Sequence, residues 1–183
     1  MALQNRPGIY ALKIHRGRKT LYVSEPTARI IDPICRAELE RTQAESAEWA
    51  LVLRHLAEAG PSSAEDLRVE LGLKPKELKK ILSPLELCGA VVSRAVGPTD
   101  EGMVEEFEYL RWDQLFPEPS GGEGRLDELI VAGVRAAVVA PERELPRWFA
   151  HRWRFEPDLV DRLVSEGRLE RPEPGWIAAP VSA

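Results

Sequence analysis

The sequence lacks the features of secreted, membrane-spanning and metal-binding proteins. It holds only two cysteines and three histidines in 183 residues, too few for a disulfide framework or a metal clip. Its apolar runs, such as AAVVA at 136–140, are far shorter than the roughly 20 residues that cross a bilayer. The amino terminus shows no signal-peptide pattern. We therefore expect a cytoplasmic protein with no membrane contact and no metal or other cofactor, whose Cys35 and Cys88 are buried structural thiols.

Catalytic motifs are missing as well. The chain contains no phosphate-binding glycine loop, no nucleophile elbow and no cluster of histidine, cysteine and acidic residues. His151 has no second histidine or cysteine at ligand spacing. Asp113 and Glu118 cannot be assigned as an acid and base pair from their spacing alone. The sequence therefore favours a protein without catalytic activity.

Charge is unevenly distributed along this 44% hydrophobic chain, whose net charge is −5. Residues 1–44 hold eight Lys or Arg against four Asp or Glu, whereas residues 98–128 hold two against ten. A basic arm beside an acidic middle indicates either two separate binding surfaces or pairing of the two within the molecule.

The first 44 residues predict a β-hairpin followed by a helix. GIYALKI and TLYVS alternate apolar and polar residues on either side of HRGRK, a pattern typical of two strands and a turn. Asp32 before Pro33 predicts a helix N-cap, with the helix running to about Gln43. We expect this region to pack on the module that follows it. The predicted tip is basic and contains Lys13, Arg16, Arg18 and Lys19.

Residues 45–116 have the order of a winged-helix module, three helices and then a β-hairpin. The first helix follows Ser46 and stops at Gly60, and a capping box of Ser62 and Glu65 predicts a short second helix. Pro75 opens a third helix. AVVSRAV and MVEEFEYL, joined by GPTDEG, then predict the hairpin.

The same order recurs weakly after a linker at 117–124, which is rich in proline and glycine. A helix from Leu126 to about Val138 is followed by ERELPRWF, a short helix interrupted by Pro146, and then by EPDLVDRLVSEGRLER. The fold class we predict is α+β, with two tandem winged-helix modules at 45–116 and 125–183, the second with a reduced wing, preceded by the hairpin and helix of 1–44. One module with a helical extension is the alternative.

The third helix carries the strongest binding signal. On a helix of 100° per residue its leucine and isoleucine side chains lie opposite Lys76, Lys79 and Lys80. This arrangement is typical of phosphate contact by a recognition helix, and also of an ordinary solvated helix face. The predicted phosphate contacts are Lys74, Lys76, Lys79 and Lys80, together with Arg94 and the basic tip residues Arg16, Arg18 and Lys19.

Three features limit what this helix can read. The predicted wing carries acidic residues that would repel phosphates, and Pro84 lies inside the helix. The lysine side of the helix offers no Arg, Asn or Gln, the side chains that make bidentate contacts with bases. Any binding should therefore favour phosphates over base sequence. The acidic wing residues are Asp100, Glu101, Glu105, Glu106 and Glu108.

A second candidate patch lies in RELPRWFAHRWRF, residues 143–155, where basic groups alternate with rings. Such a pattern can stack the bases of single-stranded nucleic acid. It is equally typical of a small core with arginines at its edge. The candidate residues are Arg147, Arg152, Trp153 and Arg154.

AEWALVLRHLAEAGPSSAEDLRVELGL and LIVAGVRAAVVAPERELPRWF resemble the helix-turn-helix segments of the bacterial crosslink-repair DNA glycosylase family, which is built from winged-helix modules. The resemblance spans residues 46–175 and implies DNA as partner. The family's catalytic Gln-x-Gln or Gln-x-Asp motif is not matched by Gln4, Gln43 or Gln114, so glycosylase activity is not carried over. The pattern is also similar to the acidic tandem winged-helix subunits of bacterial chromosome-condensation complexes.

Two functional hypotheses follow. The first is a non-catalytic protein that binds double-stranded DNA, as a transcription regulator or a DNA-repair accessory. The second is an interaction module that docks a protein partner or forms a homodimer, with its lysines paired against an acidic surface.

Overall fold

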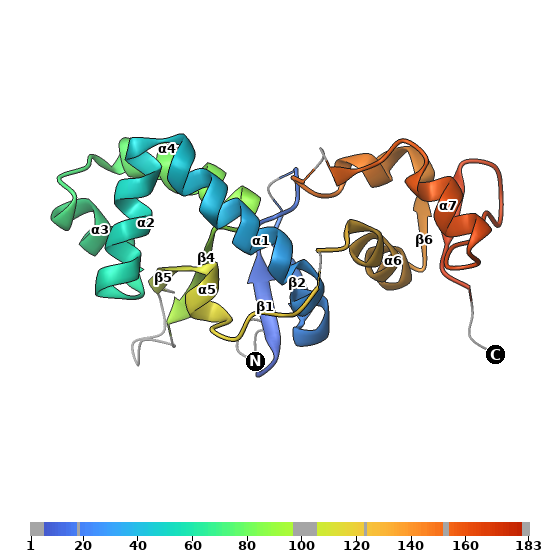
Figure 1. Ribbon diagram of the computed structural model, residues 1–183, viewed down its shortest axis with the longest axis horizontal. Coiled ribbons are helices and arrows are strands. Elements are labelled where there is room, and N and C mark those ends of the chain that lie inside the picture. Colours follow the sequence, from blue (N-terminus) through green and yellow to red (C-terminus); the bar gives the residue numbers. More distant parts are fainter. Residues whose placement is uncertain (1–5, 18, 97–105, 123, 152–153, 181–183) are drawn as a thin grey trace.

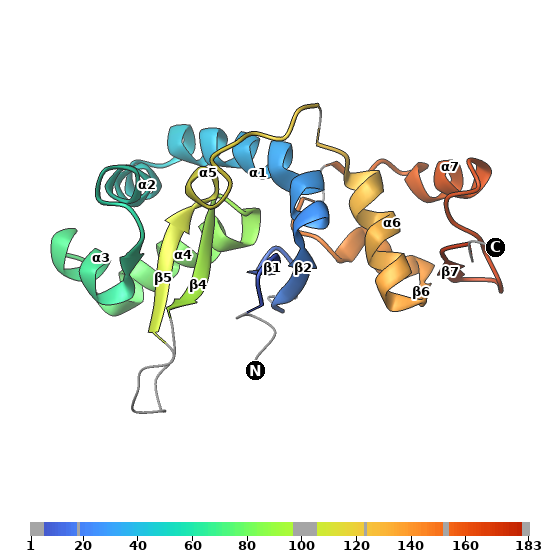
Figure 2. The same cartoon turned by 90° about the horizontal axis from the view of Figure 1, so that it is seen from below.

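The computed structural model describes residues 6–17, 19–96, 106–122, 124–151 and 154–180. In these segments the chain is a mixed α and β structure with small antiparallel sheets. Figures 1 and 2 show an elongated molecule, with helices gathered at both ends and the N-terminal hairpin and first helix between them. None of the described helices is long and apolar enough to span a bilayer.

The N-terminal hairpin forms as predicted. Strand β1 (Ile9–Leu12) pairs antiparallel with β2 (Leu21–Ser24), and Ile9 lies opposite Ser24. Beyond β1 the chain continues to pair with a distant segment, because His15 forms a β-bridge with Phe149. The hairpin is therefore joined at its far end to the C-terminal part of the chain.

Helix α1 (Glu25–Glu45) begins earlier than predicted. Pro26 lies in its first turn, where a missing N–H leaves no hydrogen bond unmade. The prediction that Asp32 caps the helix is wrong, because Asp32 and Pro33 both lie inside it. The Asp32 carboxylate is buried and accepts hydrogen bonds from Trp112 and Ser120, groups far away in the sequence.

The segment predicted as the first module contains the expected helices and strands. The capping box is shifted by one residue from the prediction, since Ser63 and Asp66 form it. A short strand, β3, lies between the first two helices of this segment and joins the sheet, whose strand order is β3-β5-β4. The elements are α2 (Ala47–Ala59), β3 (Ser62–Ser63), α3 (Ala64–Glu70), α4 (Pro75–Cys88), β4 (Val91–Val96), β5 (Glu106–Arg111) and α5 (Trp112–Leu115).

The C-terminal part repeats part of this arrangement. A strand follows its first helix, as β3 follows α2, and pairs antiparallel with the last strand, as β3 pairs with β5. ERELPR forms a 3-10 helix that contains Pro146. The last helix begins after Asp158. The elements are α6 (Leu126–Ala137), β6 (Val139–Pro141), η2 (Glu142–Arg147), α7 (Leu159–Ser165) and β7 (Trp176–Ala178).

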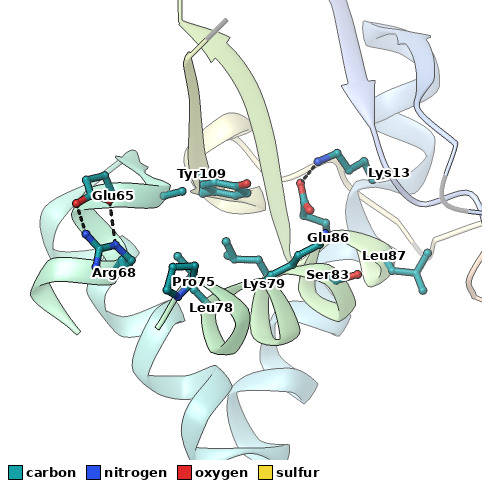
Figure 3. A pocket seen from close by; sticks show the side chains of 12 residues that line it. Lys13, Glu65, Arg68, Pro75, Leu78, Lys79, Ser83, Glu86, Leu87 and Tyr109 are labelled. Atoms are coloured by element: carbon teal, nitrogen blue, oxygen red, sulfur yellow. Dashed lines mark hydrogen bonds and ion pairs between the residues drawn. The ribbon is translucent and has the colours of Figure 1, made fainter. Parts of the chain in front are cut away.

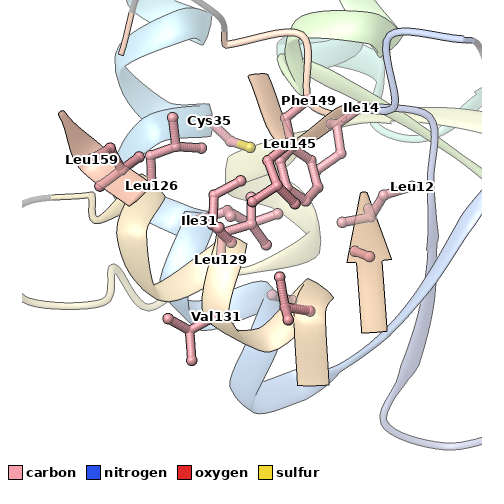
Figure 4. Packing of buried hydrophobic residues seen from close by; sticks show 14 of the residues in the cluster. Leu12, Ile14, Ile31, Cys35, Leu126, Leu129, Val131, Leu145, Phe149 and Leu159 are labelled. Carbon is pink, nitrogen blue, oxygen red and sulfur yellow. The ribbon is translucent and has the colours of Figure 1, made fainter. Parts of the chain in front are cut away.

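Two hydrophobic cores hold these parts together. One lies among α2, α3 and α4 and includes Val52, Leu67 and Leu85. The other combines the hairpin, α1, α5 and the C-terminal part, so that Leu12 and Ile31 share a core with residues of α6 and α7 (Figure 4). The N-terminal region therefore packs on both ends of the molecule, a wider role than the predicted packing on the first module.

The segment 117–124, predicted as a linker, lies against α1. The Ser120 N–H donates to the Asp32 carboxylate at 2.6 Å. A Cβ atom at Gly124 would lie 2.9 Å from the backbone nitrogen of Ile34, so the chain passes α1 too closely for a side chain.

Candidate functional site

The four lysines at the start of α4 form a cluster of exposed positive charges, which we call the lysine face. Lys74 is the N-cap of α4, and its N–H donates to the Glu77 carboxylate at 2.9 Å. On the opposite side of the helix Leu78, Ile81, Leu82 and Leu85 are buried, as their spacing predicts. The lysine face consists of Lys74, Lys76, Lys79 and Lys80, all of which are exposed.

The charges of the lysine face are uncompensated within the described part of the chain. There, none of its four lysines has an ion pair within 4.0 Å, whereas most arginines have one. On the neighbouring α3, for example, Arg68 is paired with Glu65. Glu77 is the only acidic residue between Lys74 and Lys80. The face therefore presents a positive potential to solvent, at the helix end where the backbone dipole is also positive.

A groove of about 530 Å³ lies beside the lysine face, between α3, α4 and β5 (Figure 3). Leu78, Leu82 and Tyr109 line it, and Lys79 lies on its border. Lys13 of the hairpin also lines it and forms an ion pair with Glu86 at 2.7 Å, which joins the hairpin to α4. Burial, and secondly the nearby Glu86 carboxylate, raises the pKa of Tyr109. The phenol therefore remains a protonated donor at neutral pH.

Of the predicted acidic wing residues, the structure describes the side chain of Glu108 only, and this side chain does not cover the lysine face. Glu108 lies directly opposite Arg94 on the neighbouring strand and forms an ion pair with it at 3.1 Å. This pair compensates much of the charge of Arg94, one of the predicted phosphate contacts. Asp100, Glu101, Glu105 and the side chain of Glu106 lie outside the described residues.

The predicted basic tip lies beside η2. Arg16 lines a hollow of about 760 Å³ together with Arg143 and Arg147. Lys19 is exposed nearby, and Arg18 lies outside the described residues. Partial burial, and secondly the charge of Lys19, lowers the pKa of His15. The structure thus brings together Arg16 and Arg147, which were predicted as members of two separate patches.

The described aromatic residues of 143–155 pack against the hydrophobic core. This is the arrangement predicted by the alternative to base stacking, a small core with arginines at its edge. Phe149 is buried, and Trp148 meets it edge to face with ring centroids 6.4 Å apart. Arg154 is half-buried. Arg152 and Trp153, also predicted for this patch, lie outside the described residues.

The two cysteines are buried, as predicted. Burial raises the pKa of the Cys35 thiol well above its usual value and that of Cys88 to about 11. Both thiols therefore stay protonated and unreactive at neutral pH. Among the described residues no group of three or more His, Cys, Asp or Glu side chains is placed to hold a metal ion.

His151 is completely buried, and its Nε2 lies 2.9 Å from the Cys88 carbonyl oxygen. Burial lowers the pKa of this imidazole, and the hydrogen bond offsets part of the effect. Between the lowered pKa and the unfolded value of about 6.5 the unfolded chain binds more protons than the native one. Acidification in that window therefore favours unfolding.

We expect the free energy of unfolding to fall as the pH drops below about 6.5. Urea unfolding at a series of pH values measures this. His151→Gln should remove most of the slope, whereas His15→Gln should retain most of it, because the His15 imidazole is only partly buried. A pH profile of His151→Gln equal to that of the unaltered protein would contradict the assignment.

Comparison of the chain with protein-family models, with curated proteins and with solved structures finds no match. The resemblance to the glycosylase family stays a prediction.

Sequence reasoning missed two residues that the structure makes important. Arg143 completes the arginine-lined hollow beside the hairpin, and its only signal in the sequence was its place in a basic stretch. Asp32 looked like a helix cap because proline follows it, and no local pattern shows that its partners are Trp112 and Ser120.

Proposed function

We propose that residues 45–116 form a winged-helix module that binds double-stranded DNA through its phosphates, with α4 as the contacting helix. The observation that carries the proposal is the lysine face, four exposed lysines without ion pairs in the described residues, on the third helix of the module. The element order and the β3-β5-β4 sheet support the winged-helix assignment.

Phosphate contact suits this face better than base reading does. Lysine is a flexible point charge, and base edges are recognised mainly by Arg, Asn and Gln, which the face does not offer. Each phosphate that a lysine neutralises contributes about −0.9 to the slope of log K against log salt concentration. We therefore propose DNA binding with strong salt dependence and little sequence preference.

We propose that the C-terminal part is a second, reduced module. Its helix α7 does not bind DNA in the way proposed for α4. Asp161 of α7 forms an ion pair with Arg171, and Arg171 also pairs with Glu142 at the start of η2. These pairs connect α7, η2 and the segment before β7. The proposed role of α7 is structural support.

The proposed role is an accessory or regulatory one, without catalysis. Gln114, one of the few glutamines, has both ends of its amide engaged in the fold. Its Oε1 accepts from the Arg111 N–H, and its Nε2 donates to the Leu56 carbonyl oxygen at 2.5 Å. This side chain is therefore better explained as a structural bridge than as a catalytic group.

The test is a salt titration of binding to a generic DNA duplex. We expect the protein to bind with an affinity that falls steeply with salt. The triple variant Lys76→Gln, Lys79→Gln and Lys80→Gln should reduce the salt slope by about 3. At low salt it should weaken binding at least about tenfold, because these charges supply the attraction.

A matched control neutralises three exposed arginines elsewhere, Arg6, Arg54 and Arg135, none of which has an ion pair in the described residues. This R6Q/R54Q/R135Q variant has the same net charge as the lysine variant and should bind nearly as the unaltered protein does. The proposal fails if the protein shows no salt-dependent binding, or if the two variants weaken it equally. Failure would favour the alternative, a module that docks a protein partner.

A further inference from the structure

The end of the N-terminal hairpin is fastened to the segment that carries Arg143 and Arg147. The Arg16 N–H donates to the Trp148 carbonyl oxygen at 3.1 Å, and the Ala150 N–H donates to the Ile14 carbonyl oxygen at 3.0 Å. At the turn, the Gly17 N–H donates to His15 Nδ1 at 2.9 Å. These bonds hold the backbone on both sides of the hollow. The Cα atoms of the arginines are therefore held at fixed distances from one another.

The hollow has a cationic rim with little compensation. Arg143 and Arg147 are 87% and 66% exposed, and among the described residues that line the hollow Glu144 is the one acidic residue. The Glu144 carboxylate lies 3.7 Å from a guanidinium nitrogen of each arginine, too far for a good hydrogen bond. A guanidinium group can donate two parallel hydrogen bonds to two oxygens of one phosphate. The chemistry therefore suits a phosphate of a nucleic-acid backbone.

The backbone segments that carry the two cationic surfaces follow one another along the molecule. In Figure 1 α4, the end of the hairpin and η2 follow one another along the upper edge, and Figure 2 shows the same succession along the long axis. The hairpin is joined to α4 by the ion pair of Lys13 and Glu86, and to the segment directly after η2 by the backbone bonds above. The fold therefore fixes the position of the two cationic surfaces relative to each other.

We infer that Arg16, Arg143 and Arg147 form a second phosphate-binding surface, the arginine patch, which contacts the same DNA duplex as the lysine face. This inference rests on the proposed function of α4. The hairpin then serves as a rigid connection that sets the distance between two groups of phosphate contacts on one duplex.

The test combines stoichiometry with salt dependence on a duplex of roughly 30 base pairs, about three helical turns. Analytical ultracentrifugation should show one duplex per chain. The variant Arg16→Gln, Arg143→Gln and Arg147→Gln should reduce the salt slope by about 3 and weaken binding at least about tenfold at low salt. Combined with the three lysine substitutions, the two reductions in slope should add, because the surfaces share no residue.

The R6Q/R54Q/R135Q variant is again the matched control, and circular dichroism checks that all variants fold. If the arginine variant binds like the unaltered protein while the lysine variant weakens, the arginine patch is refuted and the proposed function stands. Two duplexes bound per chain would refute the shared duplex. If the unaltered protein shows no salt-dependent binding, or if the lysine variant keeps full affinity, the proposed function fails and the two-surface arrangement fails with it.

Discussion

Replacing Asp32 with alanine should destabilise the protein by about 3–5 kcal/mol, the range found when one partner of a buried charged network is removed. The Asp32 side chain has no solvent exposure. Its carboxylate accepts from Trp112 Nε1 at 2.6 Å, from the Ser120 N–H at 2.6 Å and from Arg36 Nε at 2.9 Å. Without it the buried Trp112 N–H, the partly buried Ser120 N–H and the largely buried Arg36 guanidinium lose their acceptor.

The position of Asp32 explains why the effect should be large. Its carboxylate joins three parts of the chain, α1 itself, the start of α5 and the segment 117–124 that leads to α6. Arg36, which Asp32 holds in place, also donates to the Phe116 carbonyl oxygen. Loss of the carboxylate therefore loosens the packing of α5 and of the connecting segment on α1 together.

Urea unfolding measures the change. Asp32→Asn should cost less than Asp32→Ala, because the amide oxygen still accepts one or two of the three bonds. Asp113→Ala is the matched control, since Asp113 forms an ion pair with Arg111 nearer the surface and should cost under about 1 kcal/mol. If Asp32→Ala were no more destabilising than Asp113→Ala, the buried carboxylate would not be the connection we describe.

Replacing Gly89 with alanine should destabilise the protein by about 2–4 kcal/mol. Gly89 ends α4 with φ of 83°, a left-handed conformation that costs other residues about 1 kcal/mol. An added Cβ would also lie 2.5 Å from Cys35 Sγ, inside the core between α1 and α4. Such overpacking costs a further 1–3 kcal/mol, roughly, because the buried sulfur atom must move to accept the methyl group.

A double-mutant cycle separates the two causes. Gly72→Ala is the control for conformation alone, since Gly72 has φ of 62° and nothing within 4 Å of the added Cβ. Cys35→Ala removes the sulfur atom that the new methyl group meets, so in its background Gly89→Ala should cost about as much as Gly72→Ala. Equal costs for Gly89→Ala and Gly72→Ala in the unaltered background would show that the close contact has no energetic effect.

Local patterns along the chain predicted most of the helices and strands correctly. Ser46 and Pro75 mark the starts of α2 and α4, and the alternation on both sides of HRGRK marks β1 and β2. The lysine face was also predictable, because the period of the helix alone separates its lysines from the buried leucines. These features depend on neighbouring residues, whose influence does not require the rest of the fold.

The starts of two helices were predicted wrongly because the residue that resembled a cap contacts a distant part of the chain. Asp32 before Pro33 has the sequence of a helix cap, yet its carboxylate accepts hydrogen bonds from Trp112 and Ser120, which lie 80 and 88 positions away. Ser62 and Glu65 resemble a capping box, but Ser62 belongs to β3 and pairs with Tyr109, so Ser63 and Asp66 form the cap. In both places a contact distant in sequence determined the outcome.

By itself the sequence determined the helical and strand periods and the lysine face. Only the tertiary structure decided that the hairpin shares a core with α6 and α7, that Arg94 is paired with Glu108, and that Arg16 lies beside Arg143 and Arg147. The reason is physical. Helical and strand periods follow from local backbone geometry, whereas the pairing of a charge depends on which residues packing brings within a few ångströms of it.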